Sequence, residues 1–459
     1  MAHPNYLPSS DSLLTLPAWR LVELLRRREV SSVALTTEAL ARIDEVNPHL
    51  SAFVTVTRRA ALRAAEQVDR HWRRSDPRER GFYAGIPTAV KDLNFMRGAP
   101  AQMGTPIFRY LWSPVDDVTV AALRRGGFVF VGKTATSELG IMPVTETDNH
   151  APTRNPYDPR RSSGGSSGGA GAAVASGCLP IAHASDGAGS IRIPASFCGL
   201  VGLKASAFLA PNPHRALDTM EMSMNGSVTR DVRDTAGLLD LLVRQWQDEP
   251  HAYSRRMERP VPRTLVRVFR NPPLGTLDPR VSAVFDRAVG ALAGLGFPVE
   301  EKTFGGGISG LDDFLPIYQN LAAKLPIPTP SRLQPITRWL RDVGKTLPRG
   351  AAETACAKIV AQAEIEFAGA EFQITPTVPV IAPEIGAFAG PDGEDAFRRA
   401  AVLGAYTAAA NLTGRPAITL PAGAVDGMPV GVQLMGRRGE DAALLSLARE
   451  LEAALAFAR

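Results

Sequence analysis

A segment dense in glycine and serine, residues 162–190, constrains the fold of this chain more than any other stretch. It reads SSGGSSGG over residues 162–169, is rich in alanine up to Ser176, and ends in DGAGS over residues 186–190. Glycine costs conformational entropy, so this density is expected where the backbone must approach another group closely or adopt a positive φ. We interpret the segment as a loop, a helix of small residues, a strand over residues 179–182 and a second loop.

Helical and strand-like patterns alternate before this segment. Apolar residues recur at helical spacing over residues 35–46, after Ser31, and we expect this helix to end before Asn47-Pro48. A second helical pattern over residues 117–125 gives way to the apolar run 128–131, which is suited to a buried strand. Helices that alternate with buried strands indicate an α/β core.

The C-terminal part contains a hairpin pattern. Residues 416–422 and 430–435 are typical of two strands, and Asp426-Gly427 between them is a turn pair favoured in hairpins. A final helix is expected from about residue 440 to 457. Many α/β enzymes of this length, 459 residues, pack around one large sheet. We therefore predict a single domain over residues 1–459, with peripheral helices and substrate-facing loops at about 243–365.

Composition and charge exclude several classes of protein. No apolar run approaches the ~18 residues that a membrane helix needs, and the N-terminus lacks a signal-peptide pattern, so we expect a cytoplasmic protein that does not bind membranes. The formal net charge is +5 and the basic residues are dispersed, which argues against a nucleic-acid partner. Three cysteines without CxxC spacing indicate neither a disulfide framework nor a zinc site.

The DGAGS loop could carry out acyl chemistry. Cleavage of an amide requires a nucleophile, a base that deprotonates it, and donors directed at the oxyanion. Ser190 offers a hydroxyl, and the small residues before it leave backbone N–H groups free to converge beside it. Taken by itself, the same loop is more typical of an ordinary tight turn.

A base for Ser190 must come from elsewhere in the chain. His183 lies in a strand-like run, where a histidine is more often a core residue. Lys91 ends the apolar run 84–90, and burial could lower its pKa enough for the neutral amine to accept a proton. The alternative is a surface lysine paired with Asp92. Ser166 in its glycine loop could bridge Lys91 and Ser190.

Taken together, these motifs resemble the amidase signature family, whose hallmark is a glycine-serine stretch followed by a second serine. The resemblance covers nearly the whole chain and is weakest from about 243 to 365. The matching stretches are residues 84–92, 131–140, 155–161, 164–169, 186–204, 411–417 and 429–433. It implies the amidase signature fold, a large mixed central β-sheet flanked by helices on both faces.

The resemblance also implies roles for individual residues. Ser190 corresponds to the nucleophile, Ser166 to the bridging serine after a cis Gly165–Ser166 bond, and Lys91 to the base. The oxyanion hole corresponds to the backbone N–H groups of Gly187, Ala188 and Gly189, with Ser190 as a further donor. Ser167, Asp186 and Arg192 correspond to supporting positions, and neither a metal nor a cofactor is implied. Ala188 departs from the glycine that members often have, yet its backbone donor remains.

The implied activity is hydrolysis of C–N acyl bonds through an acyl-enzyme on Ser190. Likeness to members that act on nylon oligomers and urethanes favours small apolar amides or aryl and alkyl carbamates, without an obligate protein partner. The alternative is the glutamine-hydrolysing subunit of a tRNA-dependent amidotransferase. Residues 165–169 also fit the GxSxG elbow of α/β-hydrolases, but no histidine follows His251. A phosphate-binding loop would need a Lys-Ser/Thr pair after Gly169, which is missing.

Overall fold

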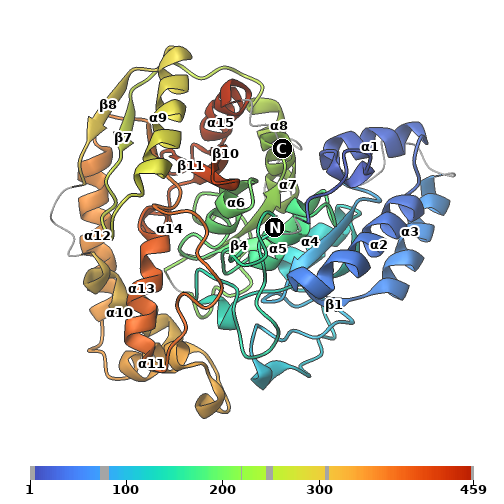
Figure 1. Ribbon diagram of the computed structural model, residues 1–459, viewed down its shortest axis with the longest axis horizontal. Coiled ribbons are helices and arrows are strands. Elements are labelled where there is room, and N and C mark those ends of the chain that lie inside the picture. The colour runs from blue at the N-terminus through green and yellow to red at the C-terminus, as the bar shows by residue number, and fades with distance from the viewer. Residues whose placement is uncertain (1–5, 73–81, 219, 244–251, 305–309, 456–459) are drawn as a thin grey trace.

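The computed structural model describes residues 6–72, 82–218, 220–243, 252–304 and 310–455. Its strands form two sheets, and the smaller has three strands in the order β1-β3-β2 (Figure 1). These strands are β1 (Phe53–Val56), β2 (Pro87–Lys91) and β3 (Val129–Thr134). β2 is parallel to β3 and β1 is antiparallel to it. The predicted strand at 128–131 is therefore present, and it extends three residues further.

The larger sheet has eight strands in the order β4-β6-β5-β10-β11-β9-β7-β8. β7 is parallel to β8 and β9, and the other pairs are antiparallel, so the sheet is mixed as predicted. The strands are β4 (Ile181–Asp186), β5 (Val201–Lys204), β6 (Met224–Thr229), β7 (Val266–Phe269), β8 (Val299–Lys302), β9 (Phe372–Pro376), β10 (Ala417–Val425) and β11 (Met428–Met435).

Helices cover this sheet. α6 packs against β5, β10 and β11, and α7, α9 and α15 contact the same sheet. Every residue of β11 is buried, which requires cover on both faces. The helices are α1 (Ala18–Arg27), α2 (Ser32–Leu50), α3 (Arg58–Trp72), α4 (Val118–Arg125), α5 (Gly168–Ala175), α6 (Arg192–Phe197), α7 (Val232–Val243), α8 (Ala252–Arg256), α9 (Pro279–Gly294), α10 (Leu311–Lys324), α11 (Pro335–Gly344), α12 (Ala351–Phe367), α13 (Gly393–Ala401), α14 (Ala408–Leu412) and α15 (Asp441–Leu455).

Most local predictions are confirmed, with shifts at the ends. α4 begins after Asp117, whose carboxylate accepts the N–H groups of Thr119 and Val120. The β10–β11 hairpin turns through Asp426 and Gly427, both at positive φ. The final helix ends at Leu455, and the last residues predicted for it, 456 and 457, lie outside the described residues.

The predicted end of the first long helix is wrong. α2 continues past Asn47 and through Pro48 to Leu50, and Ser51 follows in the left-handed region. A proline in the last turn removes only one intrahelical hydrogen bond, so the helix tolerates it there. Asn47 also fixes the chain beyond the helix, because its side chain bonds both the N–H and the carbonyl of Phe53.

The two sheets meet where β2 runs beside β4. Thr88 Oγ1 donates to the carbonyl of Ile181 at 3.0 Å, and the Lys91 N–H donates to His183 Nδ1 at 3.2 Å. Burial lowers the pKa of His183 to about 3, so the ring is neutral and its Nε2 donates to Asn225 Oδ1. His183 is therefore a core residue that positions the strand carrying Lys91.

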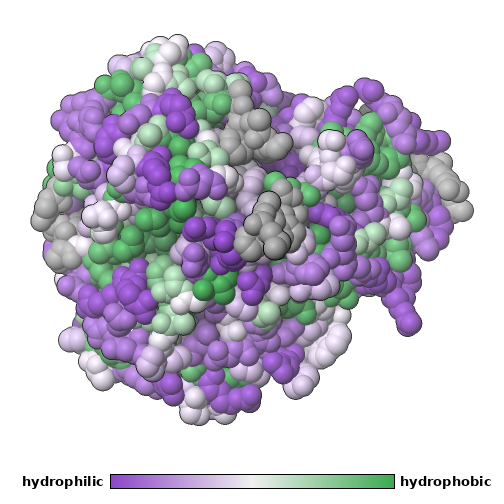
Figure 2. Space-filling model, viewed as in Figure 1, coloured by the Kyte–Doolittle hydropathy of each residue, from purple (hydrophilic) through white to green (hydrophobic). Residues whose placement is uncertain are grey.

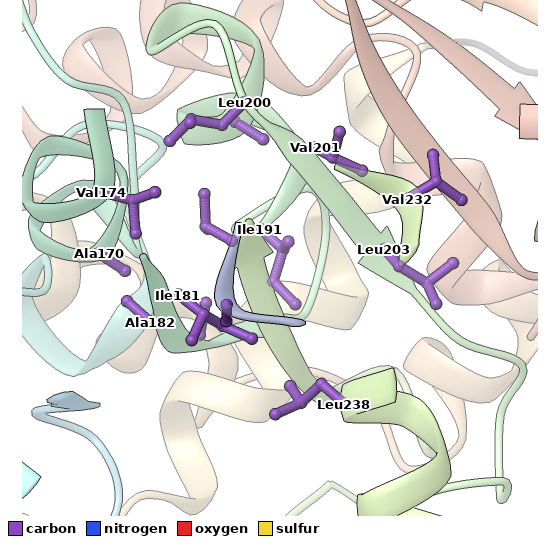
Figure 3. Packing of buried hydrophobic residues seen from close by; sticks show 14 of the residues in the cluster. Ala170, Val174, Ile181, Ala182, Ile191, Leu200, Val201, Leu203, Val232 and Leu238 are labelled. Carbon is purple, nitrogen blue, oxygen red and sulfur yellow. The ribbon is translucent and has the colours of Figure 1, made fainter. Parts of the chain in front are cut away.

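Small residues let α5 pack closely at this junction. Ala170 and Val174 of α5 lie against Ile181 and Ala182 of β4 (Figure 3). A Cβ on Gly169 would overlap the backbone of Ala52 and Ala135, so a side chain there would force the helix away. The predicted β4 starts and ends later than expected, which places Ser185 and Asp186 within the strand.

Residues 243–365 are largely helical in their described part, and α10 to α12 lie along the lower left of Figure 1. Leu311, Phe314 and Tyr318 of α10 line cavities that also contain Ser190, so in this region a helix, and not only loops, faces the site. Among the described residues, no helix combines the length and apolar character required to span a bilayer.

Candidate active site

Lys91 ends β2 and is completely buried. Its Nζ lies 2.7 Å from Ser166 Oγ and 3.1 Å from the carbonyl oxygen of Ser185, both at hydrogen-bond distance. Burial lowers its pKa to about 7, although the negative charge of Asp186 opposes this shift. A substantial fraction of Lys91 is therefore neutral near pH 7 and able to accept a proton. The alternative pairing with Asp92 does not form, because Asp92 binds Lys133 instead.

Ser166 lies in the glycine loop before α5. The Gly165–Ser166 bond is cis, as the resemblance implies. Thr145 Oγ1 donates to the carbonyl of Gly164 at 2.9 Å, and the Ser137 N–H donates to the carbonyl of Ser166 at 3.3 Å. A Cβ on Gly165 would lie 2.6 Å from the backbone nitrogen of Val144, so only glycine fits there. These contacts fix the loop with the Ser166 hydroxyl directed at Lys91.

Ser167 joins the two loops of the site. Its hydroxyl donates to the carbonyl of Ser185 on β4 at 3.1 Å, outside the glycine loop. Its N–H donates to the carbonyl of Ser190 at 3.2 Å. The second bond holds the backbone of Ser190 beside the glycine loop.

The turn between β4 and α6 presents Ser190. The carboxylate of Asp186 accepts the N–H groups of Gly189 at 2.7 Å and Ile191 at 3.0 Å, which closes the turn. Gly189 has φ 129°, and a Cβ there would overlap Thr407. In the described part of the chain, the N–H groups of Gly187, Ala188 and Ser190 have no acceptor. Gly189, which we expected among the oxyanion donors, already donates to Asp186.

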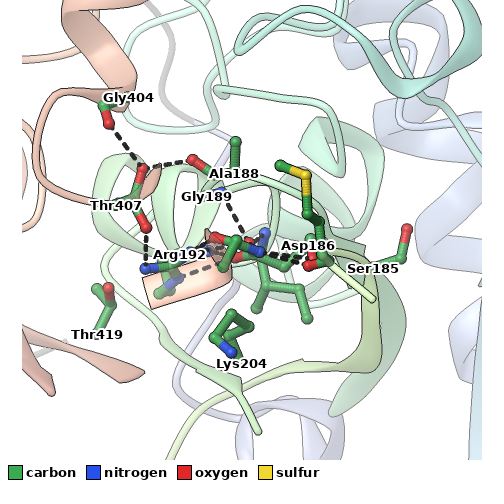
Figure 4. Close-up of polar contacts among 12 residues, drawn as sticks. Ser185, Asp186, Ala188, Gly189, Arg192, Lys204, Gly404, Thr407 and Thr419 are labelled. Atoms are coloured by element: carbon green, nitrogen blue, oxygen red, sulfur yellow. Dashed lines mark hydrogen bonds and ion pairs between the residues drawn. The ribbon is translucent and has the colours of Figure 1, made fainter. Parts of the chain in front are cut away.

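A buried network supports this turn (Figure 4). Arg192 and Asp186 form a fully buried ion pair at 2.9 Å. Burial would raise the pKa of Asp186, but Arg192 and Asn411 outweigh burial and hold it well below its usual range. Arg192 also donates to the carbonyl of Thr407 at 2.9 Å and to Gln433 Oε1 at 2.6 Å.

Sequence reasoning missed three residues of this network, Thr407, Asn411 and Gln433. Thr407 Oγ1 donates to the carbonyl of Ala188 at 2.6 Å, and Asn411 Nδ2 donates to the carbonyl of Asp186 at 3.0 Å. Asn411 and Gln433 fall in stretches that carry the family resemblance, which was the available signal. Nothing in the local sequence indicated that they contact the DGAGS loop.

Two cavities meet at Ser190. The smaller, about 130 Å³, is lined almost entirely by apolar residues, including Ala188, Ile193 and Leu412. The larger, about 350 Å³, contains Ser166 and Gly187 on a wall with several polar groups. Ile141, Ser190 and Tyr318 line both cavities. Hydrophobic surface also gathers where α14 lies (Figure 2).

Comparison with known proteins identifies the family. The amidase family profile matches residues 34–445. The chain belongs to the amidase family. The putative amidase AmiC of Mycobacterium tuberculosis (strain ATCC 25618 / H37Rv) is 33% identical over 465 residues, which cover 98% of this chain and 96% of AmiC. This amidase therefore hydrolyses carbon–nitrogen amide bonds.

Other relatives of this amidase have more specific descriptions. The 6-aminohexanoate-cyclic-dimer hydrolase of Pseudomonas sp. (strain NK87) is 33% identical, with 94% of this chain and 93% of the relative covered. A solved structure of 6-aminohexanoate cyclic dimer hydrolase with substrate has a TM-score of 0.86 and 30% identity, covering 97% of this chain and 98% of that one. A glutamyl-tRNA(Gln) amidotransferase subunit of Desulforudis audaxviator (strain MP104C) is 31% identical, with 95% of each chain covered.

Proposed function

We propose that this amidase cleaves small, uncharged amides through an acyl-enzyme on Ser190. Neutral Lys91 takes a proton from Ser166, which takes the proton of Ser190 as its oxygen attacks the carbonyl carbon. The relay returns a proton to the leaving nitrogen, and water then releases the acyl group by the same route. The observation that carries the proposal is the 2.7 Å contact between Ser166 and a buried lysine whose pKa is lowered to about 7.

The oxyanion of both tetrahedral intermediates is assigned to the free N–H groups beside Ser190. Gly187, Ala188 and Ser190 have such groups, whereas the Gly189 N–H closes the turn onto Asp186. Donors that are fixed before the reaction stabilise developing charge without reorganisation. The Asp186–Arg192 network serves this purpose because it holds the backbone of the turn in place.

The cavities support the substrate class. Among the described residues that line them there is no arginine or lysine, so a carboxylate on the substrate would lose its hydration without gaining a cation. Apolar amides avoid this penalty, as do aryl and alkyl carbamates, whose carbonyl is attacked in the same way. We therefore propose both classes as substrates, hydrolysed in the cytoplasm without a partner protein.

The test uses the purified chain alone with para-nitroanilides and a matched aryl carbamate. We expect the wild type to release nitroaniline and Ser190→Ala to be inactive with unchanged circular dichroism. Ser10→Ala replaces an exposed serine and is the matched control, which should keep full activity. Lys345→Met replaces an exposed lysine and is the corresponding control for substitution of Lys91. Full activity in Ser190→Ala would refute the proposed nucleophile.

A second candidate is the glutamine-hydrolysing component of an amidotransferase, which the 31% identity to the Desulforudis audaxviator protein favours. Free glutamine carries an α-carboxylate, and the described cavity walls offer it no cation. Glutaminase activity that exceeds anilide hydrolysis, or that requires an added partner protein, would favour this candidate. Anilide hydrolysis with no release of ammonia from glutamine, both by the isolated chain and with the partner protein added, would exclude it.

A further inference from the structure

His214 lines the larger cavity together with Ser166 and Ser190 but takes no part in the proposed proton relay. Its Nε2 is buried and has no hydrogen-bond partner among the described residues. Leaving a buried polar atom unpaired costs about 1–3 kcal/mol. An imidazole with an unpaired nitrogen in the wall of a reaction cavity indicates that a bound molecule supplies the missing partner.

The backbone of His214 is held in place between β5 and β6. Its N–H donates to Asn212 Oδ1 at 2.9 Å, and its carbonyl accepts the N–H groups of Leu217 and Asp218, both at 2.9 Å. Asp218 in turn accepts the N–H of Ser223 at 2.7 Å. The ring is therefore carried on a fixed turn, and only rotation about its side-chain bonds is needed to direct a nitrogen into the cavity.

The charge state of the ring suits a neutral ligand. Burial lowers the pKa of His214, the carboxylates of Asp117 and Asp218 oppose this shift, and the charge of Lys91 adds to it. A neutral imidazole has one donor and one acceptor nitrogen. It can therefore bind either the N–H or the carbonyl of an amide.

The proposed relay decides which part of the substrate reaches His214. The proton that leaves with the amine comes from Ser166, so the leaving nitrogen lies on the side of Ser190 where Ser166 is. Ser166 and His214 line the larger cavity, whereas the smaller cavity contains neither. The amine portion of the substrate consequently occupies the larger cavity.

We propose that His214 is a specificity-determining residue that hydrogen-bonds a second polar group, such as another amide or carbamate, in the amine portion of the substrate. The preferred substrates are then compounds with two such groups separated by an apolar spacer, cleaved so that the uncleaved group leaves with the amine. This inference rests on the proposed function, because the relay assigns the cavities.

The test measures binding by calorimetry to Ser190→Ala protein, which separates recognition from turnover. Three matched compounds share one scissile amide. The first has a second amide in its amine portion, the second has it in its acyl portion, and the third has methylene groups instead. Each substitution is combined with each change of ligand group in a thermodynamic cycle, which gives the interaction energy between the residue and that group.

We expect His214→Leu to weaken binding of the first compound about 3- to 10-fold, the effect of one neutral hydrogen bond, and to leave the other two unchanged. His214→Gln, which keeps a donor and an acceptor, restores the affinity. His150→Leu is the matched control, because His150 also has a buried, unpaired Nε2 but lines neither cavity.

Equal weakening of all three compounds, or weakening of the second compound alone, would overturn the role of His214. Thermal unfolding of each variant shows whether a loss of binding comes from an unfolded fraction of the protein. Turnover of the third compound by the wild type is measured in parallel. Its absence counts against the proposed function, while the binding cycle still decides whether His214 recognises the second group.

Discussion

Lys91 and Lys133 lie on adjacent strands, and both are completely buried, yet their surroundings differ. Lys133 Nζ binds the carboxylate of Asp92 at 2.8 Å and the carbonyls of Asn94 and Pro100 at 2.8 and 3.3 Å. Among the described residues, Lys91 Nζ contacts one hydroxyl and one carbonyl and has no carboxylate within salt-bridge distance. Lys133 is paired directly with a carboxylate, whereas the more distant charge of Asp186 only partly opposes the effect of burial on the pKa of Lys91. This contrast supports the proposed role of Lys91 as the base and indicates a structural role for Lys133.

The largest expected effect comes from removing the unpaired lysine. Lys91→Met should lower kcat/KM about 10²- to 10⁴-fold, the usual contribution of a general base. The free energy of unfolding should not fall correspondingly, because no carboxylate loses its partner. Anilide hydrolysis and denaturant unfolding measure the two quantities. Activity close to that of Lys345→Met would contradict the role of Lys91 as the base.

The reverse pattern is expected at the paired lysine. Lys133→Met leaves the carboxylate of Asp92 buried without its cation, which should lower the free energy of unfolding by about 3–5 kcal/mol. Activity per folded molecule should change far less than in Lys91→Met. Lys133→Met/Asp92→Asn should recover most of the stability, because the neutral amide still accepts the Gln102 N–H. A single variant as stable as the wild type would remove the contrast between the two lysines.

The pH dependence of activity and of stability tests the contrast between the two lysines further. As pH rises through about 7, Lys91 loses its proton and kcat/KM should rise with it. Between pH 7 and 10.5, the ordinary pKa of lysine, the unfolded chain retains a proton that the folded chain has released. The contribution of Lys91 to the free energy of unfolding should therefore increase with pH by up to about 1.4 kcal/mol per unit. Below this window both states are protonated and the full cost of burying the charge remains.

Denaturant titrations from pH 7 to above 10 measure this slope, as the difference in unfolding free energy between the wild type and Lys91→Met at each pH. A difference that does not vary with pH would show that the folded and unfolded pKa values of Lys91 are equal.

A smaller effect is expected from removing one neutral hydrogen bond at the Ser190 turn. Thr407→Val keeps the shape of the side chain but removes the 2.6 Å hydrogen bond to the carbonyl of Ala188. We expect a loss of about 1 kcal/mol of stability and a 3- to 10-fold lower kcat, because Ala188 is held less firmly at its carbonyl and its own N–H, a proposed oxyanion donor, can shift. Lower stability with an unchanged kcat would show that this bond does not position the oxyanion donors.

Local sequence was sufficient where the chain signals its own structure. The helical pattern over residues 117–125, the Asp426-Gly427 turn and the apolar run at 128–131 each predicted the element that the structure contains. Prediction failed at the ends of some helices and strands, which depend on contacts with distant residues or on where a residue falls within the element. α2 passes through Pro48 because the proline falls in its last turn, and β4 includes Ser185 and Asp186 because both pair with β6.

The candidate site divides in the same way. Ser190, Ser166 and Lys91 were identified from their motifs, and the resemblance to the amidase signature family related the three. The partner of Ser167, the occupied N–H of Gly189 and the contacts of Thr407 were not predictable. The bond from Thr407 to Ala188 joins residues 219 apart in the chain. The bonds of Ser167 and Gly189 are closer in sequence, but they depend on how the glycine loop and the DGAGS turn fold against β4.

Motifs and glycine positions are local properties, so the residue types of the candidate site and the small residues that let backbone approach backbone could be read from the sequence. Folding alone pairs Lys133 with the carboxylate of Asp92 and gives Lys91 a hydroxyl and a carbonyl as partners. Lys91 and Lys133 are both buried away from solvent. Their local sequences do not predict that the Asp92 carboxylate binds Lys133 and not Lys91, its neighbour in the chain. The pKa of a buried amine depends on the charges around it, and folding alone places those charges.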